Sequence, residues 1–316
     1  MNSGNIITTV AEYVTEVQKL NMELSTKSNQ NLFWFRGESN NGFANPLVPG
    51  SYRILANSYQ SEKSGLRCYS ETVHKLEKNI DADFFRKGHQ YLKELNVESN
   101  LLNRYFIMQH YGIPTRLLDW SENALVALFF AVSSKDNRND GVVYILEPCE
   151  LNNCTVQNIL NTEKEFKKIP ITIDSMEKKE LLNLDGELRI NELYRRYLKM
   201  DFCNEVGEDE VSYFPLAITP PPLEKRMLTQ SGSFTIFGNE IKGLIFNDKK
   251  EQFLRKVIIQ KENKKSILRE LDQLGINENS IYSDLDGLGS YLKRKYVDEF
   301  RENTDLLKQL IGRYNN

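Results

Sequence analysis

Apolar residues recur along the chain with two different periods, and together they predict a mixture of helices and strands. A helical period over residues 6–20 predicts an amphipathic helix within residues 1–24. Residues 66–110 also have helical character, with a break near residues 96–100. Short apolar runs bounded by turn residues are typical of buried strands. Such runs lie at residues 32–36, 116–119, 141–146, 214–219, 226–237 and 253–260.

The remaining pattern completes the predicted fold. Residues 263–316 are expected to form a helical tail with helices over 267–274, from the cap residue Asp284 to 295, and over 297–311. Residues 150–212 are interpreted as an inserted segment. We therefore expect an α+β fold in one domain spanning residues 1–316, with a curved mixed or antiparallel sheet of about six or more strands flanked by helices.

Residues 105–132 place several polar side chains between two apolar elements. His110, Arg116, Asp119 and Trp120 fall within eleven residues. Pro114 ends the preceding helix, residues 116–119 are predicted as a strand, and Ser121 is expected to cap a helix that starts at residue 122. Binding residues concentrate in such connecting segments. The alternative is a buried structural network, in which His110 is bonded to Asp119.

A second candidate for the site is the apolar run that ends in Arg36 and Gly37. Its pattern is typical of a buried strand that delivers one cation to a cleft, and Gly37 permits close approach of backbone or ligand. Alternatively, Arg36 forms a structural ion pair with Glu38 or Glu71. A bend in the 226–237 strand is expected to present Gln230 to the same cleft.

Charge and composition narrow the function classes. A net charge of -3 and a pI near 5.9 argue against broad electrostatic coating of DNA, but leave room for a local basic groove. Four cysteines without a CxxC pair, and no secretory signal, favour a reducing cytoplasm. With three histidines, a His/Cys zinc site is not favoured. The longest apolar run, residues 124–132, falls far short of the roughly 20 residues that span a bilayer, so no membrane partner is expected.

Three segments together resemble the FRG domain family, named for its Phe-Arg-Gly motif. They are residues 33–37 (FWFRG), residues 109–120 (QHYGIPTRLLDW), and Arg226 with residues 230–234 (QSGSF). Residues 274–276 with 284–288 are similar to the tail that many members carry. The chain departs from the family at Glu38, where members usually have glutamine. A role carried over to Arg36 is affected by this departure, because an ionised Glu38 would pair with it.

The resemblance implies a distant similarity to ADP-ribosyltransferase domains, which hold NAD in a cleft between two small sheets. The expected fold is then a split sheet around a cleft, with NAD as co-substrate. The expected protein is a cytoplasmic bacterial effector, a toxin or phage-defence transferase, that modifies a macromolecular acceptor, either protein or nucleic acid. An antitoxin or regulatory partner is also expected on this basis.

Cleavage of the nicotinamide–ribose bond passes through an oxocarbenium-like state, as glycoside cleavage does. The site needs a guanidinium for the pyrophosphate, flat aromatic surfaces, and a carboxylate or amide near the ribose. The expected catalytic residues are Arg36, Glu38, His110, Asp119 and Gln230. The expected cofactor-binding residues are Arg36, Gly37, Trp34, Tyr111, Thr115, Arg116, Trp120, Arg226 and Ser231. Trp120 is alternatively a cover for the core edge, and Phe129 and Phe130 are interpreted as core residues.

Two other functions are considered. The first is a non-catalytic module that binds a nucleotide or nucleic acid through a local basic face, with binding that weakens in salt. The arginines available for it are Arg36, Arg53, Arg104, Arg116 and Arg226. The second is a metal-dependent nuclease that acts through Glu38 and Asp119.

Overall fold

The computed structural model describes residues 5–25, 32–44, 46–56, 63–94, 101–134, 138–159, 171–172, 197–198, 213–219, 232–245, 247–298, 300–301 and 304. Among these residues, eight strands form one mixed sheet. The strands are β1 (Ile6–Ile7), β2 (Trp34–Glu38), β3 (Leu117–Ser121), β4 (Gly141–Leu146), β5 (Ile171–Thr172), β6 (Leu216–Thr219), β7 (Gly232–Ile236) and β8 (Leu254–Ile259). Their order across the sheet is β1-β8-β4-β2-β3-β7-β6-β5. The outermost pairs β1–β8 and β5–β6 are parallel and the inner pairs are antiparallel.

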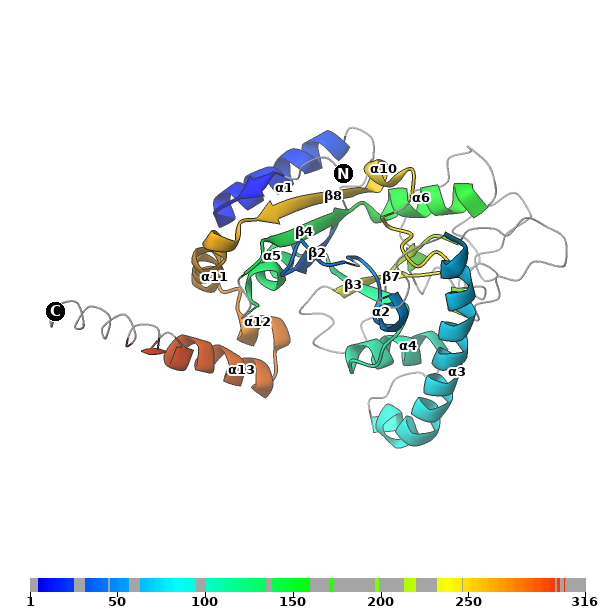
Figure 1. The fold of residues 1–316 in the computed structure, drawn as a ribbon. Helices are drawn as coiled ribbons and strands as arrows, with labels where there is room; N and C mark the ends of the chain where they lie inside the picture. The colour runs from blue at the N-terminus through cyan, green and yellow to red at the C-terminus, as the bar shows by residue number, and fades with distance from the viewer. Residues whose placement is uncertain are drawn as a thin grey trace, which may run out of the picture.

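Helices cover both faces of this sheet (Figure 1). They are α1 (Val10–Ser25), α2 (Gly50–Ala56), α3 (Lys63–Glu94), α4 (Leu101–His110), α5 (Ala124–Val132), α6 (Pro148–Ile159), α10 (Lys250–Phe253), α11 (Lys264–Gln273), α12 (Glu278–Tyr282) and α13 (Leu285–Leu292). A short 3₁₀ turn, η1 (Lys261–Asn263), precedes α11, and a π-helix, η2 (Lys293–Asp298), continues α13. The predicted class, a mixed sheet flanked by helices, is confirmed.

One face of the sheet packs against α5, with α1 and α11 beside it. Helix α5 is apolar around its whole circumference, as expected for a helix buried in the core. Its first turn is capped by Asn123, whose side-chain oxygen accepts the N–H groups of Leu125 and Val126. The prediction that Ser121 caps this helix is wrong, because Ser121 is the last residue of β3 and α5 begins three residues later.

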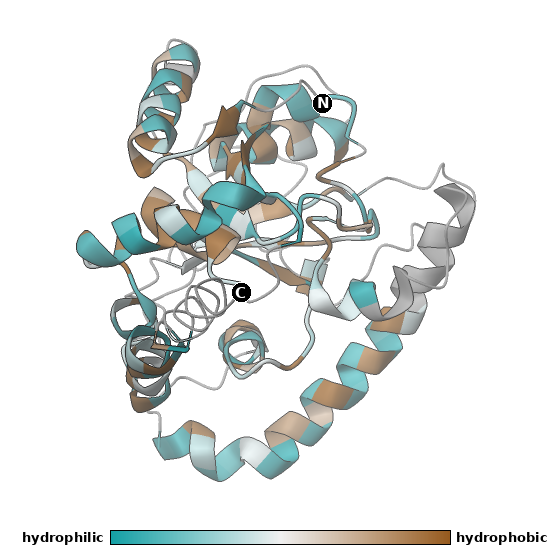
Figure 2. Cartoon of the chain, turned by 60° about the vertical axis from the view of Figure 1, so that its left-hand side comes forward, coloured by the Kyte–Doolittle hydropathy of each residue, from teal (hydrophilic) through white to brown (hydrophobic). Residues whose placement is uncertain are grey.

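Helix α4 lies on the same face as α5, where its side chains pack on Leu117, Phe234 and Ile236. The other face packs against α2, α3 and α6. Figure 2 colours the apolar residues of these elements brown. Helix α6 is tied to β6 by side chains. The Asn152 amide exchanges two hydrogen bonds with the backbone of Ala217, at 2.7 and 3.0 Å, and Thr155 donates to the carbonyl of Pro215. Residues 150–159 therefore pack against the core, and the inserted segment expected over residues 150–212 stays a prediction. Most of residues 160–212 lie outside the described residues.

Several predicted elements are confirmed, with shifts at their ends. The helical break near residues 96–100 separates α3 from α4. The predicted strand at 141–146 is β4, and Asp284 caps α13 by accepting the Gly287 N–H at 2.6 Å. Most of the predicted helix over 297–311 lies outside the described residues. Strand β1 was not predicted, since two residues are too few to show a period.

The sheet opens between its two central strands. Strand β2 pairs with β4 along its whole length, and β3 pairs likewise with β7. Between β2 and β3, however, the pairing is limited to Phe35 and Ser121. Continuing that antiparallel register would place Gly37 opposite Asp119, but these residues do not pair. The two strands therefore diverge beyond Phe35, and this divergence creates the space described below.

Burial raises the pKa of five tyrosines among the described residues, which are Tyr13, Tyr52, Tyr105, Tyr144 and Tyr197. A raised folded-state pKa contributes stability that is complete below the unfolded tyrosine pKa of about 10 and is lost as pH rises above it. We therefore expect the urea midpoint to be flat from pH 8 to 9 and to fall steeply above pH of about 10. Tyr13→Phe should reduce the fall of the urea midpoint with pH, whereas Tyr91→Phe, at an exposed position, should leave that fall unchanged. Equal slopes in all three proteins would contradict the prediction.

Candidate functional site

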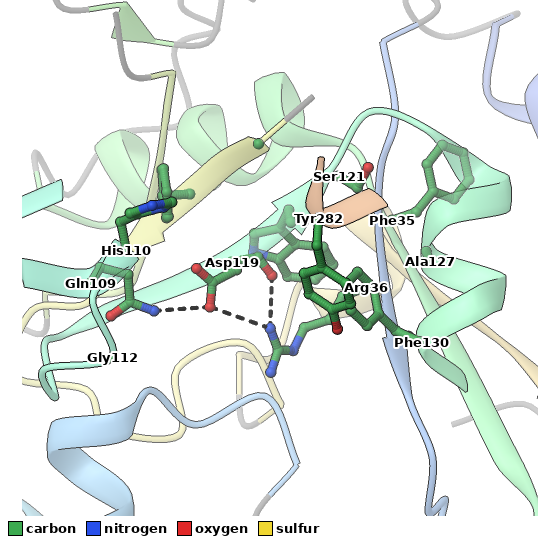
Figure 3. A pocket seen from close by; sticks show the side chains of 14 residues that line it. Phe35, Arg36, Gln109, His110, Gly112, Asp119, Ser121, Ala127, Phe130 and Tyr282 are labelled. Atoms are coloured by element: carbon green, nitrogen blue, oxygen red, sulfur yellow. Dashed lines mark hydrogen bonds and ion pairs between the residues drawn. The ribbon is translucent and has the colours of Figure 1, made fainter. Parts of the chain in front are cut away.

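A pocket of about 460 Å³ lies where β2 and β3 diverge (Figure 3). Its walls come from both strands, from the end of α4, from α5 and β7, and from α12. The lining residues are Phe35, Arg36, Gly37, Gln109, His110, Gly112, Asp119, Trp120, Ser121, Ala127, Phe130, Gly232, Phe234 and Tyr282. Pockets of this size are typical of small-molecule sites, which combine apolar walls with a few polar groups.

Arg36 reaches across the gap between the two strands. Its Nη1 donates to the backbone carbonyl of Asp119 at 2.8 Å and lies 3.9 Å from the Asp119 carboxylate. Its Nε donates to Glu38 at 3.1 Å. The expected pairing with Glu38 is therefore present, and Arg36 also lines the pocket. Its side chain is 17% exposed, so the guanidinium is held at the pocket wall and does not extend into solvent.

Glu38 lies behind Arg36 and does not line the pocket. It is buried, and its second carboxylate oxygen, Oε2, has no hydrogen-bond partner among the described residues. Tyr144 faces Arg36 across the β2–β4 pair. Burial and, secondarily, the nearby negative charge of Glu38 raise the Tyr144 pKa. In this arrangement Glu38 orients Arg36, which replaces the expected direct catalytic role with a positioning role.

Asp119 is held by a chain of hydrogen bonds that begins in the backbone of β3. The Leu117 N–H donates to Thr115 Oγ1, which donates to Gln109 Oε1 at 2.6 Å. Gln109 Nε2 then donates to Asp119 Oδ2 at 2.9 Å, as drawn in Figure 3. The Asp119 side chain is 58% exposed, so its carboxylate is oriented but still accessible. Thr115 is fully buried and takes part through this chain only, without lining the pocket.

Gln109 is a site residue that the sequence reasoning missed. Gln109 opens the QHYGIPTRLLDW run, and the run by itself does not indicate a role for its amide. The available signal was its position, one residue before His110 at the end of a helix that Gly112 and Pro114 terminate. Gly112 has a φ of +73°, a conformation that favours glycine, and the turn it makes brings Gln109 back over β3.

His110 lines the pocket at the end of α4. Its ring lies edge-on to the Tyr111 ring, with the two ring centroids 5.0 Å apart. Figure 3 shows His110 and Gln109 on the same side of the pocket, with the drawn bond to Asp119 coming from Gln109. Tyr111 is 59% exposed and does not line the pocket, and its expected contact with the cofactor stays a prediction.

Arg116 does not line the pocket, and the expectation that it binds the cofactor is corrected. It is fully buried and forms an ion pair with Glu77 of α3 at 2.7 Å. Its remaining donors reach the carbonyls of Phe237 and Tyr197, and its backbone N–H donates to the Tyr105 hydroxyl. Burial alone would lower the Arg116 pKa, but the Glu77 carboxylate raises it overall. Arg116 is thus a structural cation that joins β3 to α3 and α4.

The two tryptophans differ in position. Trp34 is fully buried in the core and away from the pocket, which corrects its assignment as a cofactor-binding residue. Trp120 is also buried, and its indole N–H donates to Thr235 at 3.1 Å, yet one part of it lines the pocket. The position of Trp120 therefore fits both a residue that binds the cofactor and a residue that covers the edge of the core.

Gly37 and Phe130 show how α5 forms one wall. A Cβ on Gly37 would lie 1.8 Å from the Ala127 carbonyl oxygen, so the glycine allows α5 to rest directly on β2. Phe130, expected to be a core residue, is only partly buried and lines the pocket. Phe129 is buried in the core as expected.

The late-strand residues of the predicted site are only partly visible. Arg226, Gln230 and Ser231 lie outside the described residues, and their neighbours Gly232 and Phe234 line the pocket. Within the described part of the chain, no group of three or more His, Cys, Asp or Glu residues could hold a metal ion. The same part contains no helix with the length and apolar character needed to cross a membrane.

Comparison with known proteins identifies one family. Residues 31–140 match the family model of the FRG domain. No curated protein and no solved structure matches the chain. The matched segment contains β2, α4, β3 and α5, and with them most of the pocket wall. Gly232, Phe234 and Tyr282 are contributed from beyond it.

Proposed function

We propose that this FRG-domain chain binds NAD in the β2–β3 pocket and acts as an ADP-ribosyltransferase-like effector on a macromolecular acceptor. The observation that carries the proposal is the meeting of the Arg36 guanidinium and the Asp119 carboxylate in a pocket at a split in the sheet. A sheet that opens around its ligand is what similarity to ADP-ribosyltransferase domains implies. The proposal includes a cytoplasmic toxin or defence role, with a regulatory partner.

Arg36 suits a diphosphate group. Two of its nitrogens are already engaged, by Glu38 and by the Asp119 carbonyl, which fixes the plane of the guanidinium. Within the described residues no hydrogen bond is made by Nη2, so this edge is available to an anionic oxygen. A pre-oriented guanidinium loses little conformational entropy when it binds phosphate, which favours arginine over lysine at this position.

Asp119 suits the ribose. When the C1′–N bond breaks, its electron pair leaves with neutral nicotinamide and positive charge develops on the ribose. A carboxylate held in advance by Gln109 would stabilise that charge without reorganising. The acceptor group then bonds to C1′ and loses a proton, for which His110 in the pocket wall is the candidate base. Gln230 retains its proposed polarising role.

A second function is favoured by one further arginine. Arg53 of α2 lies near Arg36: burial, and then the positive charge of Arg36, lower the Arg53 pKa. Its Nε is held by the Val48 carbonyl at 2.8 Å. Two neighbouring guanidiniums support the proposal of a non-catalytic nucleotide- or nucleic-acid-binding module, which needs a local basic face. Arg104 is engaged by Asp81 and contributes less to such a face.

The test is the response of NAD binding and turnover to Arg36→Ala. Removing a charged hydrogen-bond donor costs about 1.5–3 kcal/mol, so we expect calorimetry to show NAD affinity weakened roughly 10- to 100-fold. Transfer of label from NAD to lysate should fall in parallel. Arg86→Ala removes the same charge from an exposed ion pair on α3 and should change neither quantity.

The outcomes separate the two functions. A wild-type protein that neither binds NAD nor releases nicotinamide would overturn the first proposal. Binding of nucleotides or single-stranded nucleic acid that weakens steeply with salt, without nicotinamide release, would establish the module instead.

A further inference from the structure

The C-terminal segment supplies one wall of the pocket. Tyr282, the last residue of α12, lines the pocket together with residues of β2 and β3 that precede it by more than 160 positions. Figure 3 shows its ring on the same side of the pocket as Phe130. Residue 282 lies outside the segment that matches the FRG family model, between the two short runs, 274–276 and 284–288, that resemble the tail of the family.

Several contacts fix Tyr282 in place. Asn277 and Ser280 form a reciprocal capping box at the start of α12. The chain then turns at Ser283, which has a φ of +53°, and enters α13. A Cβ on Gly287 would lie only 2.7 Å from the Tyr282 Cβ, so α13 rests against the base of the tyrosine. The position of the Tyr282 ring therefore depends on the close packing of α13.

Phe130 and Tyr282 form an aromatic pair. Their ring centroids are 6.4 Å apart and the ring planes are inclined by 76°, an edge-to-face arrangement. Both side chains are partly buried and both line the pocket. Such a pair offers one ring face and one ring edge to a flat ligand. From β2 and β3, Arg36 and Asp119 offer charged groups to the rest of the same ligand.

We propose that Phe130 and Tyr282 form a binding subsite for a planar heteroaromatic ring, and that stacking on Tyr282 provides much of its affinity. The geometry carries this: two aromatic side chains from α5 and α12 lie in one pocket with a guanidinium and a carboxylate, which is the composition that a nucleotide requires. Stacking of a base on an aromatic side chain is favourable and tolerant of ring identity. This inference rests on the proposed function for its probe, NAD, which carries both a nicotinamide and an adenine ring.

The experiment measures the affinities of NAD, nicotinamide mononucleotide and ADP-ribose for wild type, Tyr282→Ala and Tyr282→Phe. The two shorter nucleotides each carry one of the two rings. Loss of stacking should weaken binding of NAD, and of the shorter ligand whose ring occupies the subsite, by roughly 5- to 100-fold in Tyr282→Ala. Tyr282→Phe keeps the ring and should bind as wild type does. Tyr291→Ala, an aromatic change on α13 away from the pocket, serves as the matched control.

Gly287→Ala provides a second variant that keeps the tyrosine but displaces it. We expect Gly287→Ala to weaken binding of the same ligands as Tyr282→Ala does. Circular dichroism checks that the variant retains its fold. Equal affinities of wild type and Tyr282→Ala for every ligand would overturn the subsite and leave the proposed function standing. Loss of affinity in Tyr291→Ala as large as in Tyr282→Ala would also overturn it, because the effect would then come from the tail as a whole.

A wild-type protein that binds none of the three nucleotides would overturn the proposed function, and a fragment measurement then tests the subsite alone. Nicotinamide and adenine are titrated into protein with isotope-labelled tyrosine, and the Tyr282 ring signal is assigned through Tyr282→Phe. A shift of that signal with either fragment supports the subsite, and no shift with both overturns it.

Discussion

Arg116→Met is expected to lower the free energy of unfolding by about 3–5 kcal/mol, because it leaves the buried Glu77 carboxylate without its counter-charge. The Phe237 and Tyr197 carbonyls lose their donors in the same step. Urea unfolding followed by tryptophan fluorescence measures the change. Arg86→Met, in the exposed ion pair with Asp83, is the control and should cost less than about 1 kcal/mol.

The double variant Glu77→Gln with Arg116→Met separates charge from packing. Replacing both members of a buried ion pair is far less damaging than removing one. We therefore expect the double variant to recover most of the stability that Arg116→Met loses. Equal loss in the single and double variants would contradict the role assigned to the ion pair, and an NAD affinity changed in a fully folded Arg116→Lys protein would return Arg116 to the binding site.

Gly37→Ala is expected to destabilise the fold by about 3 kcal/mol or more, and it adds a single methyl group. That methyl would lie 1.8 Å from the Ala127 carbonyl oxygen and 2.7 Å from the Ala131 nitrogen. Because these are backbone atoms of a buried helix, relief requires α5 to move away from β2, and overpacking of this kind costs 1–3 kcal/mol or more. The displacement would also move Phe130 and widen the pocket.

Gly289→Ala is the matched control for this prediction. Gly289 lies within α13, and a Cβ there meets nothing within 4 Å. Alanine is a better helix former than glycine by about 1 kcal/mol, so this variant should be neutral or slightly stabilised. Urea midpoints of the two variants check the pair. A Gly37→Ala protein as stable as wild type would show that α5 does not press on β2 as described.

Residues near the pocket illustrate why residue type and position in sequence did not reveal side-chain roles. Arg36 and Arg116 each stand within or beside an apolar strand, and the sequence reasoning assigned both to the cofactor. Their roles differ because Arg36 lies where β2 and β3 diverge, whereas Arg116 forms an ion pair with Glu77 of α3, 39 positions earlier in the sequence. That carboxylate can only be recognised as the partner once α3 is placed against the sheet.

Two aromatic residues and one glutamine line the pocket although the sequence pattern did not indicate it. Helix α5 is apolar on all sides, so its period does not indicate which face meets the pocket, and Phe130 was interpreted as core alongside Phe129. Tyr282 was not considered, because nothing in residues 276–284 indicates that this turn returns to β2. Gln109 was overlooked since its amide acquires a role only when the Gly112 turn brings it to Asp119.

The sequence by itself determined the local structure and the family of its central segment. Period and turn residues located β4, β8, the break between α3 and α4 and the Asp284 cap, because local sterics and burial of one face dictate these features. Tertiary structure alone decided which side chains share the pocket, because that depends on a divergence of two strands and on the return of a distant C-terminal turn. Both are set by packing between segments that are far apart in the chain, and no local period records them.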